Sequence, residues 1–152
     1  MRPKEVLGIP YRFVYHQKFH AWGLMEKLVT PQEKVMVSDL EFTILECLSG
    51  LDKSGGLTKA AKGLWLVKDR IDFAKLKTYV RKMGKYTVTK RLGVILETYK
   101  IGGKALLNDL RRRTNKKYDL LDPLLLSEGK YDARWRLRMN VNPQELLEAV
   151  RT

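Results

Sequence analysis

A run of cations near position 111 holds the residue types best suited to bind phosphate groups. Three arginines are consecutive there and two lysines follow closely: Arg111, Arg112, Arg113, Lys116 and Lys117. Guanidinium and ammonium groups bind phosphate oxygens through charge-assisted hydrogen bonds, and arginine does so in a planar, two-pronged geometry. These five side chains are therefore the first candidates for contacts with the backbone of a nucleic acid.

A second row of arginines alternates with apolar residues near the end of the chain. The segment R-W-R-L-R-M-N-V, residues 134–141, predicts a strand whose apolar side chains face the core. Arg134, Arg136 and Arg138 would then share the other face, about 7 Å apart. Because like charges in such a row repel one another, we expect either internal carboxylates or bound phosphates beside them.

The charge balance of the whole chain points the same way. The 152 residues carry a formal net charge of +13, and the pI is near 9.9. Residues 75–117 hold 14 Lys and Arg but only two acids, Glu97 and Asp109. This excess favours a polyanionic partner, nucleic acid and DNA in particular. The alternative is that these cations only keep helix faces solvated.

Five acids are the available groups for a metal-dependent nuclease: Asp39, Glu41, Glu46, Asp119 and Asp122. Asp39 and Glu41 are also explained as residues at a helix start, and Asp122 as a turn residue. The sequence has no glycine-rich phosphate loop, no Ser/His/Asp set and no cluster with metal-ligand spacing. We therefore predict no catalytic residue, no metal and no cofactor.

The remaining reactive residues favour structural roles. His16 and His20 have the spacing of a metal pair on a helix, but no Cys, Asp or Glu stands near them at ligand spacing, so packing or loop histidines are expected. Cys47, the only cysteine, lies in an apolar segment and is interpreted as a core residue in a reducing compartment. No uncharged apolar run is long enough for a membrane span, and the start lacks a signal-peptide core, so a cytoplasmic protein is expected.

The element expected to organise the others is a strand followed by a helix within residues 35–51. Val35–Val37 is predicted as a short buried strand, and Ser38 with Glu41 as the capping box of a helix that ends near Gly50. Residues 52–56 are expected to form a loop. Further helices are predicted at 59–67, 73–83, 86–99, 104–113 and 144–150, and further strands at 11–15, 24–29, 118–121 and 134–141. Gly93, inside the 86–99 helix, is expected to mark close packing.

These elements predict one α+β domain over residues 1–152, with residues 1–10 as a loose lead-in. We expect a small mixed or antiparallel sheet in which the N-terminal strands pair with the 134–141 strand. About five to six helices should pack mainly on one side of it.

Several segments in order resemble the C-terminal domain of AbiEi-type antitoxins, the regulator half of abortive-infection toxin–antitoxin pairs. The matching segments are V-S-D-L-E-F-T-I-L-E-C-L at 37–48, G-G with A-A-K at 55–62, R-L-G-V-I-L-E at 91–97, L-L-D-P at 120–123 and G-K-Y-D-A-R-W-R-L-R-M-N-V at 129–141. F-H-A-W-G-L at 19–24 fits the segment that precedes them. Arg91 lies in the third of these, where it either has a functional role or anchors the helix through an internal ion pair.

The resemblance implies a non-enzymatic antitoxin or transcriptional regulator of a phage-defence system, functionally linked to a nucleotidyltransferase-like toxin. Family members commonly carry an N-terminal winged helix-turn-helix domain, for which residues 1–10 offer no room. We therefore expect a separated or stand-alone version of the C-terminal domain. One alternative is a protein-interaction module that faces a toxin or forms a homo-oligomer, with the aromatic-rich segment 11–22 as its interface. The other alternative is the metal-dependent nuclease considered above.

Overall fold

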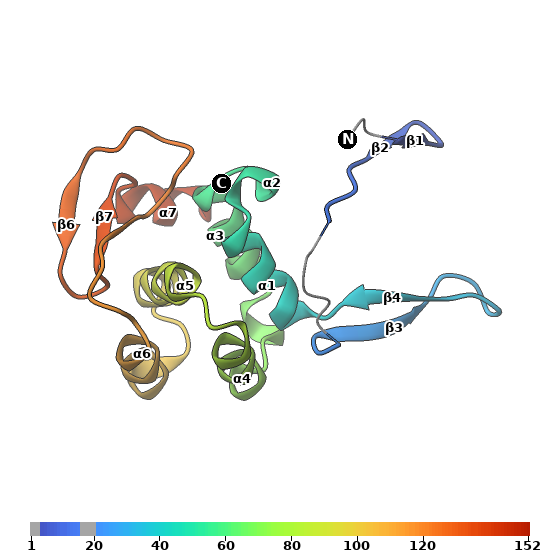
Figure 1. Cartoon of the computed structure of the whole chain (residues 1–152), viewed down its shortest axis with the longest axis horizontal. Helices are drawn as coiled ribbons and strands as arrows, with labels where there is room; N and C mark the ends of the chain where they lie inside the picture. The colour runs from blue at the N-terminus through green and yellow to red at the C-terminus, as the bar shows by residue number, and fades with distance from the viewer. Residues whose placement is uncertain (1–3, 16–20) are drawn as a thin grey trace.

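The computed structural model describes residues 4–15 and 21–152 and confirms the α+β class. The described residues form seven α-helices, one 3-10 helix and seven short strands (Figure 1). In chain order these elements are β1 (Lys4–Val6), β2 (Ile9–Tyr11), β3 (Leu24–Leu28), β4 (Lys34–Ser38), α1 (Leu40–Ser49), α2 (Leu51–Ser54), α3 (Leu57–Leu66), η1 (Lys68–Arg70), α4 (Phe73–Met83), α5 (Tyr86–Tyr99), α6 (Gly103–Arg112), β5 (Asp119–Leu120), β6 (Lys130–Asp132), β7 (Leu137–Met139) and α7 (Pro143–Ala149).

Helix α5 is the centre of the helical body. It packs against α1, α6 and α7, and every residue from 88 to 96 is buried, so the helix is covered on all sides. Gly93 makes this possible on one side, because a methyl group there would overlap the indole ring of Trp135. The predicted close packing at Gly93 is thus confirmed, and the element it admits is the segment before β7.

Helix α1 begins differently from the prediction. Asp39, not Ser38, is the N-cap residue: its Oδ1 accepts from the Phe42 amide at 3.0 Å. The Ser38 hydroxyl instead shares a 2.7 Å hydrogen bond with the Thr43 hydroxyl. Glu41 does not reach back to the cap. It reaches across to α4, so the predicted capping box is wrong and an interhelical contact takes its place.

The strands form three separate sheets rather than one. β1 pairs with β2 and β3 with β4, while β7 lies between β5, its parallel neighbour, and β6, its antiparallel neighbour. The predicted pairing of the N-terminal strands with the C-terminal one is therefore wrong. The strand predicted over 134–141 is shortened to β7, because residues 133–136 form the turn after β6 and Arg136 adopts a left-handed conformation with φ of 53°.

The N-terminal strands are not part of the core. β3 and β4 form a hairpin that extends away from the helices (Figure 1). Val35 and Met36 are exposed and only Val37 is half-buried, so the prediction of a buried strand at 35–37 is wrong. The predicted lead-in contains the β1–β2 hairpin, and the strand expected over 11–15 is limited to Tyr11 at the end of β2.

Local signals located most helix boundaries well. Asp72 caps α4 and Gly84 ends it, α5 has the predicted bounds, and Asn142 caps α7 through a capping box with Glu145. The loop expected at 52–56 instead contains most of the short helix α2. No helix of residues 4–15 and 21–152 is both long and apolar enough to cross a membrane.

Candidate nucleic-acid interface

The predicted arginine run lies at the C-terminal end of α6. Helix α6 buries Leu106 and Leu110 against the body and leaves its last turn at the surface. Arg112 is the most open of the three arginines, with 78% of its side chain exposed. Arg111 is partly buried and donates from Nη2 to Asn108 Oδ1 at 2.6 Å. Cations at this end of a helix also interact favourably with its dipole.

Arg113 has a structural partner that limits its availability. Its Nε donates to Oδ2 of Asp109 at 2.8 Å, and Lys77 and Arg112 lie at 3.6 Å and 3.9 Å from the same carboxylate. Asp109 is buried, and the hydrogen bond from Arg113 lowers its pKa further than burial raises it. Asp109 thus holds three cations from two helices close together.

Lys90 and Arg91 are not on the surface. Arg91 donates from Nε to the Leu121 carbonyl and from Nη1 to the Leu48 carbonyl, both at 2.9 Å, and burial lowers its pKa. It anchors α5 to α1 and to the segment after β5 through backbone carbonyls, so neither the predicted phosphate contact nor the predicted internal ion pair describes it. Lys90 is fully buried and donates to Asp119 Oδ2 at 2.6 Å and to the Lys117 carbonyl.

Three neighbouring surface hollows lie around the ends of α4, α5 and α6. One of about 380 Å³ is lined by Arg81, Arg112 and Arg113. The second, of about 620 Å³, shares Arg112 and adds Arg111 and Arg134. A third, of about 360 Å³, shares Gly84 and Tyr86 with the first and adds Lys85 and Lys117. Arg91 also lines the third hollow, but its side chain is buried. We call the other cations that line these three hollows the basic track: Arg81, Lys85, Arg111, Arg112, Arg113, Lys117 and Arg134.

The start of α5 increases the positive potential of the basic track. Its N-cap residue is Lys85, whose side chain makes no capping hydrogen bond, and the first turn contains no acid. Helix N-termini carry a partial positive charge and amide groups without hydrogen-bond acceptors. A lysine at the N-cap supplies neither a negative charge nor an acceptor, so both remain available to an anion. Tyr86, 51% exposed, lies at the junction of two hollows and offers an aromatic ring between the cations. Sequence patterns gave no signal for this junction. Lys116 is exposed but lines none of the three hollows.

The predicted row of three arginines does not exist as a row. Arg134 lies in the turn after β6, and its Nη2 forms a 2.6 Å ion pair with Glu97, which also accepts from Trp135 Nε1 at 2.7 Å. Arg136 lies over the ring of Tyr118 and Arg138 over that of Tyr131. The sequence predicted either internal carboxylates or bound phosphates beside these arginines. Arg134 has an internal carboxylate, Glu97, whereas Arg136 and Arg138 contact aromatic rings.

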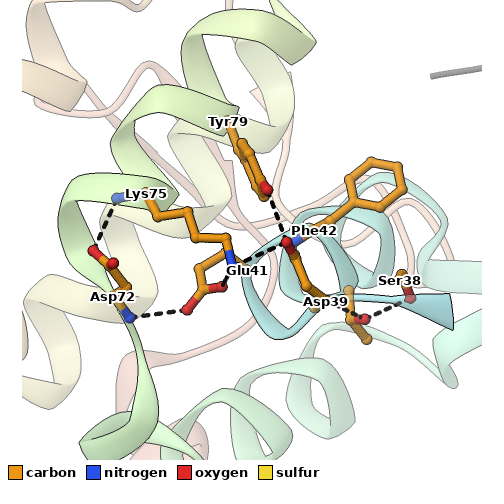
Figure 2. A network of polar contacts seen from close by, with 8 residues as sticks. Ser38, Asp39, Glu41, Phe42, Asp72, Lys75 and Tyr79 are labelled. Carbon is orange, nitrogen blue, oxygen red and sulfur yellow. Dashed lines mark hydrogen bonds and ion pairs between the residues drawn. The ribbon is translucent and has the colours of Figure 1, made fainter. Parts of the chain in front are cut away.

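The acids at the start of α1 form a bridge to α4 (Figure 2). Lys75 Nζ lies 3.0 Å from both Asp39 Oδ2 and Glu41 Oε2, and the Tyr79 hydroxyl donates to Asp39 Oδ2 at 2.7 Å. The amide of Asp72 donates to Glu41 Oε1 at 2.9 Å. Burial raises the pKa of Asp39, but the hydrogen bonds from Phe42, Tyr79 and Lys75 together hold it below its ordinary value of 3.8. Both carboxylates thus have helix-joining roles.

The other candidate acids also have partners. Asp119 pairs with Lys90, as described, and Asp122 Oδ2 accepts from the Leu57 amide at 2.8 Å. Asp122 thereby caps α3 from a distant part of the chain. Glu46 lines a separate hollow of about 410 Å³ together with Cys47. Cys47 is only partly buried, so the predicted core position is wrong, although burial still raises the pKa of its thiol.

His16 and His20 lie outside the described residues. Within residues 4–15 and 21–152, no three His, Cys, Asp or Glu side chains come together in a way that would hold a metal ion.

Comparison with known proteins adds no assignment to this geometry. No protein-family model, curated protein or solved structure was found to match the chain.

Proposed function

We propose that this chain is a non-enzymatic nucleic-acid-binding module of the antitoxin or transcriptional-regulator type. The observation that carries the proposal is the basic track, in which cations from α4, the N-cap of α5, the end of α6, the segment before β5 and the β6–β7 turn line neighbouring hollows. Cations that are far apart in the sequence are thus gathered at one surface. Such convergence is what a polyanion requires, because each phosphate contact releases condensed counterions.

The environment of the individual cations supports phosphate as their ligand. Arg81, Arg112 and Lys117 are exposed, and of these three only Arg112 has a nearby carboxylate in the described part of the chain, at 3.9 Å. Their charges are therefore largely uncompensated. The buried cations Lys90 and Arg91 have structural explanations and are not part of the proposal. Arg113 and Arg134 line the track with their charges already paired to Asp109 and Glu97.

The biological setting of the proposal comes from the sequence. The resemblance to the AbiEi C-terminal domain supports an antitoxin role in phage defence, with a functional link to a nucleotidyltransferase-like toxin and a cytoplasmic location. The absence of enzymatic activity is supported by the acids, since Asp39, Glu41, Asp119 and Asp122 hold helices and strands together. Cleavage of labelled DNA or RNA on addition of Mg²⁺ would contradict this part of the proposal.

A salt titration tests the proposal. Binding of the full chain to a labelled DNA duplex and to single-stranded RNA is measured by fluorescence anisotropy at increasing NaCl. We expect the logarithm of the affinity to fall linearly with the logarithm of the salt concentration, at roughly 0.7–0.9 units for each phosphate contacted. An affinity that is unchanged between low and moderate salt, or no binding to either polymer at low salt, contradicts it.

The β3–β4 hairpin supports a second candidate function, docking of a second copy of the chain. Met25, Leu28 and Met36 are exposed at 49%, 61% and 59%, and an isolated two-stranded hairpin is only marginally stable. Residues 24–38 contain two acids and two lysines, so this segment is electrically balanced on a strongly cationic protein. Two copies therefore meet there with the least repulsion.

Light scattering over a range of protein concentrations tests this second function. We expect the wild type to form a dimer and a Met25→Thr/Val35→Thr variant to stay monomeric, because threonine keeps β propensity while removing exposed apolar area. A wild-type protein that is monomeric at every concentration rules out self-association through the hairpin.

A further inference from the structure

The outer face of the β5–β7–β6 sheet carries aromatic and guanidinium groups. The strand register places Leu120, Arg138 and Tyr131 side by side on this face, whereas Leu137, next to Arg138 along β7, is buried against the body. Tyr118 and Arg136 precede β5 and β7 by one position, and the contacts of Tyr118 with Tyr131 and of Arg136 with Tyr118 place both beside this group. Two tyrosines and two arginines therefore share one side of a three-stranded sheet.

The four side chains form an interlocked platform. The Tyr118 and Tyr131 rings are 5.2 Å apart at 87°, in an edge-to-face arrangement. The Arg136 guanidinium lies 5.5 Å from the centre of the Tyr118 ring, and that of Arg138 lies 5.4 Å from the centre of the Tyr131 ring. Tyr131 is 63% exposed and Tyr118 is 36% exposed, so both side chains remain accessible to a ligand.

The two arginines are held in place without a counter-charge. Arg138 donates to the Ser127 hydroxyl at 3.2 Å and to the Gly129 carbonyl at 3.4 Å, and Arg136 donates to the Tyr118 hydroxyl at 3.2 Å. Within the described residues, neither forms an ion pair with a carboxylate. Their planes are ordered by neutral partners, while their charges are left for an anionic ligand.

We propose that this platform binds the unstacked bases of a single-stranded nucleic acid, an inference that rests on the proposed function and names its ligand class. Tyrosine rings and arginine planes stack on nucleobases, and the same arginines attract the adjoining phosphates. A duplex offers no such contact on a flat sheet, since its bases are already stacked inside. The preferred ligand is a single strand that runs from the basic track onto the sheet.

The position of the platform relative to the basic track supports a continuous path. Lys117, which lines one hollow, directly precedes Tyr118. Arg134, which lines another hollow with Arg111, lies in the same β6–β7 turn as Arg136. A short single-stranded nucleic acid is therefore long enough to place phosphates on the basic track and bases on the sheet at the same time.

The test compares oligo(U), oligo(dT) and a DNA duplex of the same length, each with the wild-type chain and two variants. Tyr131→Leu keeps apolar bulk and removes the most exposed aromatic ring of the platform, and Tyr131→Phe is the matched control that keeps the ring. Tyr118 is left unchanged because its hydroxyl accepts from Arg136. Tyr131 is outside the core, so both variants are expected to fold. We expect tighter binding of single strands than of duplex and a loss of about tenfold or more in the leucine variant. The salt slope should be unchanged in that variant, because the phosphate contacts remain.

The outcomes separate the two proposals. Duplex bound as tightly as single strands, with the leucine variant equal to wild type, overturns the platform as a base-binding site while leaving a salt-dependent nucleic-acid-binding module. A phenylalanine variant that loses as much affinity as the leucine variant also overturns it, since stacking needs the ring and not the hydroxyl. Absence of binding to all three polymers at low salt overturns the proposed function itself.

Discussion

At the scale of single residues, burial divides cations that are indistinguishable in the sequence. Lys90 and Arg91 belong to the same basic segment as Arg112, yet their side chains are buried in the body and bound to Asp119 and to backbone carbonyls. Periodicity assigns one apolar face to a helix, whereas α5 is covered on all sides. The burial of these two residues depends on neighbours that are distant in the chain, and local periodicity does not identify such neighbours.

The Lys90–Asp119 pair gives the first prediction. Lys90→Met retains the apolar stem but leaves the Asp119 carboxylate without its cation, and should reduce the free energy of unfolding by about 3 kcal/mol. A Lys90→Met/Asp119→Asn double variant should be less destabilised, because it leaves no unpaired charge. Urea unfolding of both variants checks this. A change within about 0.5 kcal/mol for Lys90→Met, as is usual for surface residues, would be inconsistent with the buried pair.

The lowered pKa of Asp39 leads us to expect that the stability of the fold depends on pH. Its hydrogen bonds hold its folded-state pKa below 3.8. The stabilisation is therefore complete above the unfolded-state pKa and is lost as pH falls through the folded-state pKa. Wild type should exceed Asp39→Asn in stability at neutral pH, and this difference should shrink between about pH 5 and pH 2. Urea midpoints across that range measure it, and a difference that stays constant would show that Asp39 is not a stabilising carboxylate.

At the scale of elements, the contact between α5 and the segment before β7 depends on a missing side chain. Gly93→Ala should lower the free energy of unfolding by about 1–3 kcal/mol, because its methyl group would overlap Trp135. Gly63→Ala is the matched control. Gly63 lies within α3 with no atom near its would-be methyl group, so that variant should gain about 0.5–1 kcal/mol. Equal effects at the two positions, measured by thermal or urea unfolding, would exclude this packing argument.

The elements also show what the sequence can predict. The bounds of α4 and α5 follow from local signals, such as the Asp72 cap and Gly84. Strand pairing is not local: the apolar residues of 35–37 have the same character whether a strand is buried or, as here, lies in an exposed hairpin. The arginines at 134–138 were predicted to share a face because alternation assumes an extended strand, and the left-handed turn at Arg136 breaks that assumption.

At the scale of the whole molecule, the cations and the apolar hairpin are separate surfaces. The cations of the basic track lie around the ends of α4, α5 and α6. The β3–β4 hairpin leads into the N-terminal end of α1, extends away from the helices (Figure 1) and carries a balanced charge. Five of the cations predicted from the sequence line the track: Arg111, Arg112, Arg113, Lys117 and Arg134. Arg81 and Lys85 join them, and only the structure identifies these two. Nucleic-acid binding and self-association are thus compatible in one chain.

The most direct test of the central proposal compares two variants of equal net charge. Arg81→Gln/Arg112→Gln/Lys117→Gln removes exposed cations from the basic track, and Arg70→Gln/Arg151→Gln/Lys59→Gln removes three exposed cations that line none of its hollows. Neither variant touches Arg113, whose loss would leave Asp109 with a weaker set of partners. The measurement is the slope of log affinity against log salt for a labelled oligonucleotide. We expect the track variant to bind more weakly, with a slope shallower by about two to three units, and the control variant to keep nearly the wild-type slope. Equal slopes in the two variants would contradict the basic track, because the charge of the protein would then act without regard to position.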